Sequence, residues 1–407
     1  MIETTDHQRL RQQVRDFADA EVAPRVADME TCATADTALP ALIARQGWIG
    51  VTIPADYGGM AGGHFAKTII IEELSRVSGT AGAIAQASQL GVAKILHFGT
   101  EEQKQRWLPP IASGDCLPTI AVTEEGSGGH VLGMRTTAAR DGDHYVLNGR
   151  KQYVGNSHVG HVHGVVACTG GDGAKANREL SAFLVEADRP GVRLIPHQRT
   201  MGLRGFSFGD IVFEDVRVPA THRLGAEGDG LDVAYSSSIL YGRPNLAAVA
   251  LGILRAAVEE TVSFSKQRHR YGRPLSQHPV IMHKIGALEQ RLNTARTLVY
   301  QAVHRLDHGQ PCDRELINSK YHAVEAAIDS TRDAVRIHGA AGLRTNRPVE
   351  RLYRDAICTD APAGTRDIQL YRLAEAALGV DRPQWSARFA RSTALHPPTE
   401  DGTVLSA

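Results

Sequence analysis

The stretch that decides the fold is residues 119–156, TIAVTEEGSGGHVLGMRTTAARDGDHYVLNGRKQYVGN, because its pattern differs from the sequence on either side. Long segments with helical spacing flank it, whereas the stretch itself holds a glycine-rich turn at residues 126–129 and alternating runs such as residues 145–147. The Asn148-Gly149 pair that follows is a strong signal for a β-hairpin. The sequence therefore predicts strands inserted into an otherwise helical protein.

The loop that begins at Thr123 and Glu124 has the composition of a ligand-binding loop. The glycines that follow these two residues allow backbone N–H groups to approach a ligand closely. A phosphate or a flat heteroaromatic ring is recognised in this way. The loop alone does not identify its ligand.

Composition and charge describe a globular protein of two or three domains. The 407 residues exceed what one hydrophobic core usually supports. Lys+Arg and Asp+Glu both number 45, so no overall charge attracts nucleic acid or an anionic membrane. We expect neither a signal peptide nor a membrane-spanning helix. The five cysteines are far apart and form no CxxC pair, which predicts reduced thiols and a cytoplasmic protein.

Hydrophobic periodicity divides the chain into an N-terminal helical domain at residues 1–116, a middle β-domain at 117–230, a C-terminal four-helix bundle at 231–380 and a loose polar tail at 381–407. The fold class is thus α+β. The helices predicted before the β-domain are residues 5–29, 38–46, 66–77, 81–98 and 101–113. The predicted strands are residues 145–147, 163–168, 181–185, 192–195 and 210–216. The helices predicted for the bundle are residues 231–269, 277–308, 314–339 and 367–378.

Several motifs spread along the chain resemble the acyl-CoA dehydrogenase family, flavin enzymes that desaturate acyl thioesters. Within the opening stretch the resemblance rests on Thr-Glu at 123–124, the glycine loop, Asn-Gly-Arg-Lys at 148–151 and Asn156. The other motifs that keep the family's order are YGG at 57–59, EEL at 72–74, FGTEEQK at 98–104, RHRYGRP at 268–274, RPVERLYRD at 347–355 and GTRDIQ at 364–369. The resemblance implies the acyl-CoA dehydrogenase fold, FAD as cofactor and a homotetramer or dimer.

The resemblance also implies which residues hold FAD between the β-domain and the bundle. The residues at the family's cofactor-binding positions are Val122, Thr123, Gly128, Gly129, Tyr153, Val154, Gly155, Arg268, Tyr271, Gly339, Ala340, Thr365 and Asp367. Among them, Arg268 and Tyr271 are expected to reach the ADP half of the cofactor across a subunit contact. Glycine replaces a hydroxyl-bearing residue of the family pattern at Gly129 and Gly155, and each lost hydrogen bond weakens binding by about 1 kcal/mol.

The family's catalytic carboxylate is absent from both positions at which relatives carry it. Most relatives have a Glu directly before the Gly-Thr pair at 364–365, where this chain has Ala363. Others carry it before Arg243, where this chain has Gly242. The backbone N–H of Ala363 still matches the group that binds the thioester carbonyl. General base catalysis contributes roughly a hundred- to ten-thousandfold to a rate, so a replacement base is sought. The candidate bases by motif position are Glu124, His130, Tyr241 and Asp367.

The implied substrate is an acyl thioester carried by CoA or by an acyl-carrier protein. Gly242 and Arg243 match substrate-binding positions, and Arg243 either binds the phosphopantetheine or nucleotide of the carrier or forms a salt bridge on the helix surface. Leu240 replaces the carboxylate that accompanies this Arg in relatives. This replacement favours a carrier protein over CoA, and with it a role in secondary metabolism such as polyketide biosynthesis.

Four explanations of the missing base stay open. The base comes from elsewhere in the chain, or the substrate needs no strong base, as with a hydroxy- or amino-acyl thioester on a carrier protein. Alternatively, the flavin uses oxygen, as hydroxylases of this fold do, or the chain is a catalytically silent subunit of a heteromer. Because the Gly-Thr and Arg-Tyr-Gly motifs remain, we favour an active FAD-dependent oxidoreductase whose electron acceptor is a flavoprotein or oxygen. The silent subunit, a flavin hydroxylase and a non-redox enzyme of the same fold are the alternatives.

Some candidates have a simpler structural interpretation. His158, His161 and His163 have no Asp, Glu or Cys companion at ligand spacing, so a solvated or hydrogen-bonded loop is favoured over a metal site. Glu124 is more typical of an acceptor for the backbone N–H groups of its own loop. Tyr241 is as typical of a packing ring as of an acid.

Overall fold

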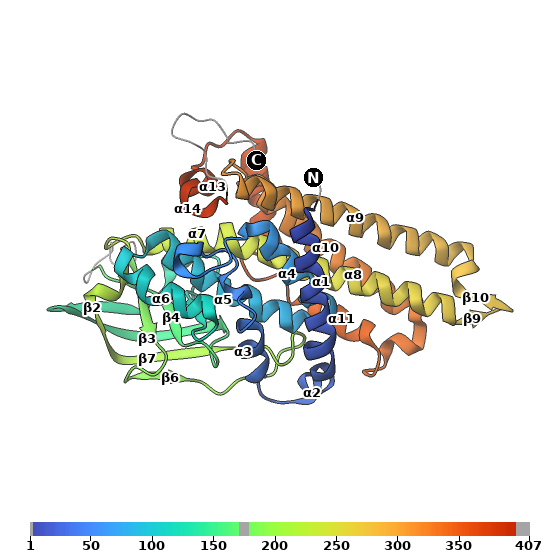
Figure 1. Ribbon diagram of the computed structural model, residues 1–407, viewed down its shortest axis with the longest axis horizontal. Coiled ribbons are helices and arrows are strands. Elements are labelled where there is room, and N and C mark those ends of the chain that lie inside the picture. The colour runs from blue at the N-terminus through green and yellow to red at the C-terminus, as the bar shows by residue number, and fades with distance from the viewer. Residues whose placement is uncertain (1–2, 171–178, 396–407) are drawn as a thin grey trace.

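The structure, a computed structural model, describes residues 3–170 and 179–395. Helices come first, a β-sheet follows, and long helices complete the chain (Figure 1). This order confirms the predicted α+β class. Within the described residues, no helix is both long and apolar enough to cross a membrane.

The helices before the sheet are α1 (Thr5–Phe17), α2 (Val26–Thr31), α3 (Ala38–Ala44), α4 (Gly63–Val77), α5 (Gly79–Phe98) and α6 (Glu101–Ser113). The single helix predicted over 5–29 is interrupted after Phe17 by a π-helical and then a 3-10 turn. Pro24 lies in the 3-10 turn and lacks the N–H that a continuous α-helix needs. Helix α4 begins three residues earlier than predicted because the Asp307 carboxylate accepts hydrogen bonds from the N–H groups of His64 and Phe65, at 2.6 and 2.8 Å.

The sheet lies at one end of the molecule and mixes parallel and antiparallel pairs (Figure 1). Its strands are β1 (Pro118–Ala121), β2 (Thr137–Asp141), β3 (His144–Gly155), β4 (Val162–Cys168), β5 (Leu180–Glu186), β6 (Val192–Leu194), β7 (Phe208–Pro219) and β8 (Arg223–Leu224). The order is β6-β7-β3-β2-β4-β5-β8, and β1 pairs with β4. The long β3–β7 ladder is irregular between Lys151 and Val154, which places a bulge at Tyr153. The predicted strands do not include β1, β2 or β8.

The helices after the sheet are α7 (Gly230–Ser236), α8 (Arg243–Gln267), α9 (Pro279–Asp307), α10 (Asp313–His338), α11 (Pro348–Ile357) and α12 (Arg366–Ala377). The helix predicted over 231–269 is divided by a π-helical turn, Ser237–Gly242, which precedes Pro244 in the first turn of α8. Helices α8 and α9 project from the body as an antiparallel arm (Figure 1). A short hairpin ends this arm, formed by β9 (His269–Arg270) and β10 (Arg273–Pro274).

The segment expected to be a loose polar tail contains two short helices, α13 (Trp385–Arg388) and α14 (Ala390–Thr393). The expectation is therefore wrong for this part of the tail. The Asp313 carboxylate accepts hydrogen bonds from the N–H groups of Trp385 and Ser386, both at 2.8 Å, and so fixes the start of α13. Residues 396–407 lie outside the described residues.

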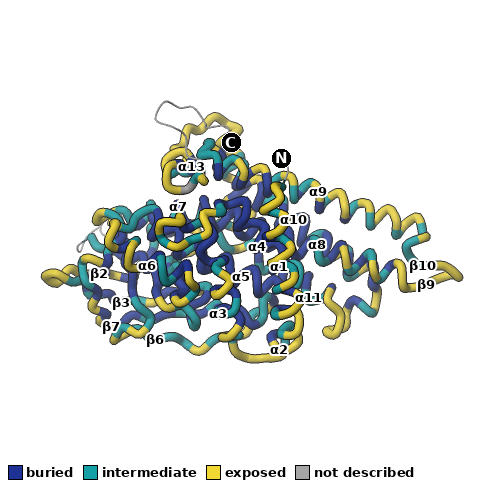
Figure 2. The backbone as a smooth tube through the Cα atoms, viewed as in Figure 1, coloured by how far each residue is buried: buried dark blue, intermediate teal, exposed yellow. Residues whose placement is uncertain are grey.

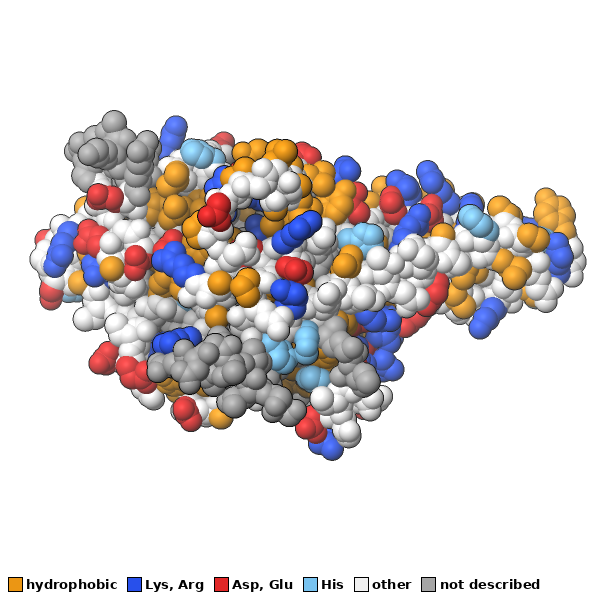
Figure 3. All heavy atoms as spheres, turned by 90° about the horizontal axis from the view of Figure 1, so that it is seen from above, with side chains coloured by type: hydrophobic (Ala, Val, Ile, Leu, Met, Phe, Trp, Pro, Cys, Tyr) orange, Lys and Arg blue, Asp and Glu red, His pale blue; other side chains and the backbone are white. Residues whose placement is uncertain are grey.

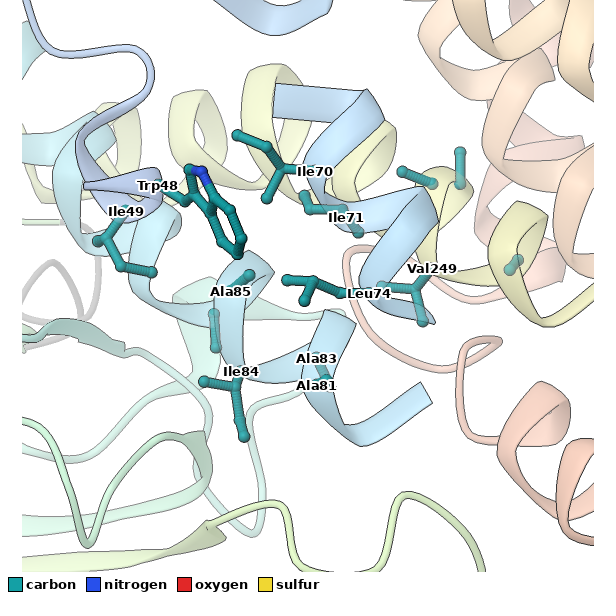
Figure 4. Packing of buried hydrophobic residues seen from close by; sticks show 14 of the residues in the cluster. Trp48, Ile49, Ile70, Ile71, Leu74, Ala81, Ala83, Ile84, Ala85 and Val249 are labelled. Carbon is teal, nitrogen blue, oxygen red and sulfur yellow. The ribbon is translucent and has the colours of Figure 1, made fainter. Parts of the chain in front are cut away.

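The main core is centred on α4 and α5, which are buried along most of their length (Figure 2). Trp48, Ile70, Leu74 and Ile84 pack there with Val249 of α8 (Figure 4). The projecting arm is more exposed than this central region (Figure 2). The core thus fixes α5 against α8, and this contact positions the candidate site.

A buried ion network ties the first helices to the arm. Glu72 and Glu73 of α4 are fully buried. Arg255 of α8 and Arg11 of α1 each approach Glu73 at 2.6 Å, and Arg296 of α9 approaches Glu72 at 2.9 Å. Burial alone would raise the pKa of Glu73, but the guanidinium groups, Arg255 foremost, hold it at about 2. Burial also opposes ionisation of Glu72, but Arg11, Arg296 and Tyr300 lower its pKa, so both carboxylates are charged in the native state.

Candidate active site

The two positions that lack the expected carboxylate lie against each other. Gly242 ends the π-helical turn before α8, and Ala363 lies in the turn before α12. A Cβ atom added to Gly242 would lie 2.9 Å from the Cβ of Ala363 and 3.5 Å from Cδ2 of Leu90 on α5. A carboxylate on either residue would therefore act in the same small region, and neither residue supplies one.

Lys320 of α10 holds the turn that carries Ala363 through hydrogen bonds to its backbone. Ala363 has a φ of 56°, and Gly364 has a φ of 97°. The Lys320 ammonium donates hydrogen bonds to the carbonyl oxygens of Asp360 and Gly364, at 2.7 and 2.6 Å. Gln369 donates to the same Gly364 oxygen at 2.8 Å. These bonds fix the turn and with it the direction of the Ala363 N–H.

Sequence reasoning missed Lys320, although a signal was present. Lys320 is fully buried, as are Leu316 and Val324 at helical spacing on either side. A lysine inside the apolar face of a helix indicates a buried partner. Burial, reinforced by the charge of nearby Arg243, lowers the pKa of Lys320 to about 7.

Arg243 is buried beside this turn without a partner. Its side chain is buried, and burial lowers the pKa of the guanidinium to about 10. Its Nε has no hydrogen-bond partner, and no described residue forms an ion pair with the group. The carboxylate of Asp313, whose charge acts on Arg243, is bound to the N–H groups at the start of α13. The interpretation of Arg243 as a surface salt bridge is therefore wrong.

Glu124 is engaged in structural contacts. Its carboxylate accepts hydrogen bonds from the N–H groups of Arg135 and Thr136, at 2.6 and 3.0 Å. The buried ammonium of Lys151 lies 2.6 Å away. Burial opposes ionisation of Glu124, but the charge of Lys151 and the hydrogen bonds from Lys151, Thr136 and Arg135 together outweigh it, so the pKa of Glu124 is lowered. This geometry favours the structural interpretation of Glu124 over a role as base.

The remaining candidate bases differ in accessibility. Tyr241 is buried, its ring lies 4.8 Å from the ring of His64, and the ammonium of Lys67 lies 4.2 Å from the ring centroid. Burial raises the pKa of Tyr241 well above its ordinary value. His130, in the glycine loop, and Asp367, in the first turn of α12, are exposed. Accessibility thus favours His130 and Asp367.

The residues expected to contact the flavin ring form an open loop beside β3. The N–H of Gln152 donates to the carbonyl of Thr123 at 2.8 Å, which joins the loop to the strand. At the bulge, Tyr153 has a φ of 56° and a side chain that is 60% exposed. Apart from the adjacent residues, no atom of the described part of the chain lies within 4 Å of a Cβ added to Gly128 or Gly129. An open glycine loop next to an exposed aromatic ring fits a flat heteroaromatic cofactor with a phosphate chain. Val122 is half-buried, whereas Val154 is fully buried.

Gly155 is required by the close approach of α5. A Cβ at this position would lie 2.9 Å from the Cβ of Ala87 and 3.1 Å from the ring of Phe206. The hydroxyl-bearing side chain of the family pattern does not fit here unless α5 moves. The replacement by glycine therefore belongs to the packing of this chain.

The other expected cofactor residues lie elsewhere in the chain's fold. Arg268 follows α8, and Tyr271 is 94% exposed in the hairpin at the tip of the arm. Figure 1 shows this tip at the opposite end of the molecule from β2 and β3. Gly339 and Ala340 are exposed after α10, and Thr365 precedes α12. One chain does not bring Arg268 and Tyr271 together with the loop at Thr123.

The three histidines near β4 have separate hydrogen-bond partners. His158 Nε2 lies 2.8 Å from the carbonyl oxygen of Ile195, His161 Nδ1 accepts from the N–H of Leu117 at 3.0 Å, and His163 Nδ1 lies 2.7 Å from the hydroxyl of Thr119. Within residues 3–170 and 179–395, no group of three His, Cys, Asp or Glu side chains is placed to hold a metal ion. These rings support the local loop structure.

Comparison with known proteins identifies the family. The acyl-CoA dehydrogenase N-terminal, middle and C-terminal domain models match residues 4–115, 119–216 and 228–378. The chain belongs to the acyl-CoA dehydrogenase family, flavin-dependent oxidoreductases that act on acyl thioesters. Related solved structures are FAD complexes, and FAD is the cofactor of the family.

Individual relatives match along nearly their whole length. An acyl-CoA dehydrogenase of Bacillus subtilis (strain 168) is 36% identical over 92% of this chain and 99% of its own. The structure of butyryl-CoA dehydrogenase from Megasphaera elsdenii superposes with a TM-score of 0.90 at 31% identity, covering 93% of this chain and 99% of the other. A prolyl acyl carrier protein oxidase gives a TM-score of 0.85 at 26% identity, covering 92% of this chain and 100% of the other. The fold predicted from the motifs is confirmed.

Proposed function

We propose that this protein is an FAD-dependent oxidoreductase that acts on a carrier-bound acyl thioester without a carboxylate at either of the family's usual positions. The observation that carries the proposal is the contact between Gly242 and Ala363, because neither of these two adjoining positions supplies a carboxylate while the Ala363 N–H remains. FAD, when bound, would supply the acceptor for the hydride of the substrate. The residues that would hold it are those of the open loop, Val122 to Gly129, and the segment of β3 from Tyr153 to Gly155.

The chain's own contribution is to polarise and orient the thioester. Lys320 fixes the turn through the Asp360 and Gly364 carbonyl groups. The Ala363 N–H is therefore oriented before the thioester carbonyl binds, and no reorganisation energy is needed during the reaction. Polarising the thioester carbonyl makes the adjacent C–H more acidic. A base other than the usual Glu can then remove the proton, and the exposed His130 and Asp367 are the candidates.

Arg243 supports a substrate with an anionic carrier arm. A buried charge without a partner costs several kcal/mol, so the guanidinium is expected to meet an anion when substrate is bound. The phosphate of a phosphopantetheine arm has the required charge. Leu240, buried one turn earlier, supplies none of the polarity that CoA-binding relatives have there. The similarity to a prolyl acyl carrier protein oxidase also favours a carrier protein, and with it a role in secondary metabolism such as polyketide biosynthesis.

The test is anaerobic reduction of the reconstituted enzyme by matched thioesters. Purified protein is loaded with FAD and mixed with the same acyl group on CoA and on a phosphopantetheinylated carrier protein. Loss of the visible flavin band should be at least tenfold faster with the carrier-bound form. H130N and D367N identify the base, since the correct one lowers the rate by about a hundredfold or more. Protein that binds no FAD, or alters no thioester, contradicts the proposal. Re-oxidation by oxygen or by an acceptor flavoprotein then identifies the electron acceptor.

A catalytically silent subunit is the second candidate function. It is favoured by the engagement of Glu124 with Lys151 and by the burial of Tyr241, which leave His130 and Asp367, both exposed, among the four candidate bases. This alternative predicts that the protein co-purifies from its native cells with a homologue that carries the usual Glu. It also predicts that neither H130N nor D367N changes the activity of that complex.

We also propose a homotetramer, or at least a dimer, in the cytoplasm. The hairpin that carries Arg268 and Tyr271 needs the glycine loop of another subunit, and Val280 and Met282 beside it are 63% and 57% exposed. Figure 3 shows apolar side chains on the surface at this end. The five free cysteines support a reducing compartment. Light scattering measures the mass, and a monomer that binds FAD fully would contradict the shared site.

A further inference from the structure

Two buried amide side chains lie between α5 and α8, one helical turn from Gly242. Asn245 of α8 is fully buried, and Gln86 of α5 is 7% exposed. The Asn245 side-chain NH₂ donates to the backbone carbonyl of Gln86 at 3.2 Å. Leu90, one turn after Gln86, is the residue whose side chain approaches Gly242. The amide pair thus adjoins the place where Gly242, Leu90 and Ala363 meet.

The oxygens of both amides lack a hydrogen-bond partner. Neither Gln86 Oε1 nor Asn245 Oδ1 is paired within the described part of the chain. The orientation of Asn245 is fixed, because its NH₂ group faces a carbonyl oxygen. A buried acceptor without a partner costs about 1–3 kcal/mol. Two such groups on facing helices need an explanation, because apolar residues of the same size would pack here without this cost.

Several side chains on the neighbouring turns are apolar and offer these oxygens no donor. On α5, Ala83 and Ala87 are buried, and on α8 Leu246 and Val249 are buried. A saturated hydrocarbon chain entering this region would leave both amide oxygens unpaired in the complex as well. An acyl group with an O–H or N–H would instead satisfy them.

We propose that Gln86 and Asn245 select an acyl group that carries a hydrogen-bond donor, a hydroxyl or an amine, on the part of the chain beyond the thioester. This inference rests on the proposed function, because it assumes that the acyl group enters beside Gly242 and Ala363. The substrate class is then a hydroxyacyl or aminoacyl thioester. Sites that hydrogen-bond a substrate group reject analogues that lack it far more strongly than apolar pockets reject a change of size.

The experiment compares three acyl groups on one carrier with the FAD-loaded enzyme. Butyryl, 3-hydroxybutyryl and 3-aminobutyryl thioesters are measured by kcat/KM for anaerobic flavin reduction. We expect kcat/KM for one donor-bearing thioester to exceed that for butyryl by at least a hundredfold. The thioester with the higher kcat/KM shows whether the site selects a hydroxyl or an amine. In N245L this preference should fall at least tenfold.

The matched control is Q89L. Gln89 is a fully buried amide of the same helix with an unpaired oxygen, but it donates to the carbonyl of Trp48, away from α8. Its replacement should leave the preference unchanged. The comparison of thioesters on the unaltered protein still decides the matter if N245L fails to fold. Butyryl turnover as fast as that of both donor-bearing thioesters overturns this inference and leaves the proposed function standing. Inactivity toward every thioester overturns the proposed function, and this inference with it.

Discussion

The buried amine of Lys320 should make the stability of this protein depend on pH in a defined direction. Replacement of Lys320 by Met keeps the length of the side chain and removes the group that titrates. Burial, with the charge of Arg243, lowers the native pKa from 10.5 to about 7. The unfolded chain exposes the amine to water, where its pKa is ordinary. The two states therefore differ in proton binding across this interval.

The sign follows from which state holds the proton. Below about pH 7 both states are protonated, and the cost of burying the ammonium is fully present. Between about pH 7 and 10 the unfolded chain holds a proton that the native amine has released, so stability rises with pH. One pH unit in this interval corresponds to about 1.4 kcal/mol. The wild type should therefore gain about 2–3 kcal/mol relative to K320M between about pH 7.5 and 9.5.

Urea unfolding of both proteins at a series of pH values measures this difference. Subtracting the K320M values removes the titrations that the two proteins share. K266M, at an exposed lysine near the end of α8, serves as control and should give a constant difference from the wild type. A constant difference for K320M as well would refute the reasoning. It would show that the amine under the Ala363 turn is not held in a low-polarity environment.

Three further predictions concern the residues around the site. E124Q should destabilise the protein by about 3–5 kcal/mol in chemical denaturation, because it leaves Lys151 as a buried, unpaired cation; unchanged stability would contradict the ion pair. In the wild type this stabilisation is present at neutral pH and is lost as pH falls through the lowered pKa of Glu124. G155A should cost about 1–3 kcal/mol and weaken FAD binding, because the new methyl group would meet Ala87; a thermal shift measurement with and without FAD tests it. Burial, only partly offset by hydrogen bonds at the start of α4, raises the pKa of Asp307 to about 6. Wild-type stability should therefore fall relative to D307N as pH rises from about 4 to 6, and parallel pH curves for the two proteins would be evidence against this.

The long helices and the presence of strands in the middle were predictable because the spacing of apolar residues along the chain does not depend on which elements pack together. The π-helical turn that ends at Gly242 was not predictable, because its residues have the same apolar spacing as an α-helix, and Pro244 is the one sign of a break. The α9 start at Pro279 lay within two residues of its prediction. The hairpin after α8 lies inside the motif RHRYGRP at 268–274, which the resemblance links to cofactor binding and not to a turn.

The site was predictable only where a motif marks a position. Gly242 and Ala363 were singled out from separate motifs, and the structure places them in contact. By contrast, the bond between Asn245 and Gln86 and the pairing of Glu124 with Lys151 depend on which helix or strand packs against which. No local pattern carries that information. A buried Lys or Asn inside an apolar face only shows that a partner exists.

The ion network at Glu72 and Glu73 also constrains how the chain folds as it is made. Glu73 emerges from the ribosome 182 positions before Arg255, and Glu72 emerges 224 positions before Arg296. At about 5–20 residues per second, Glu73 waits roughly ten to forty seconds for that partner. Of the described arginines that approach Glu73 in the fold, Arg11 and Arg15 of α1 and Arg76 of α4 are already synthesised during this time. The first helices can therefore adopt their final packing only after most of the chain has been synthesised, and a nascent chain stalled at residue 230 is expected to be bound by chaperones.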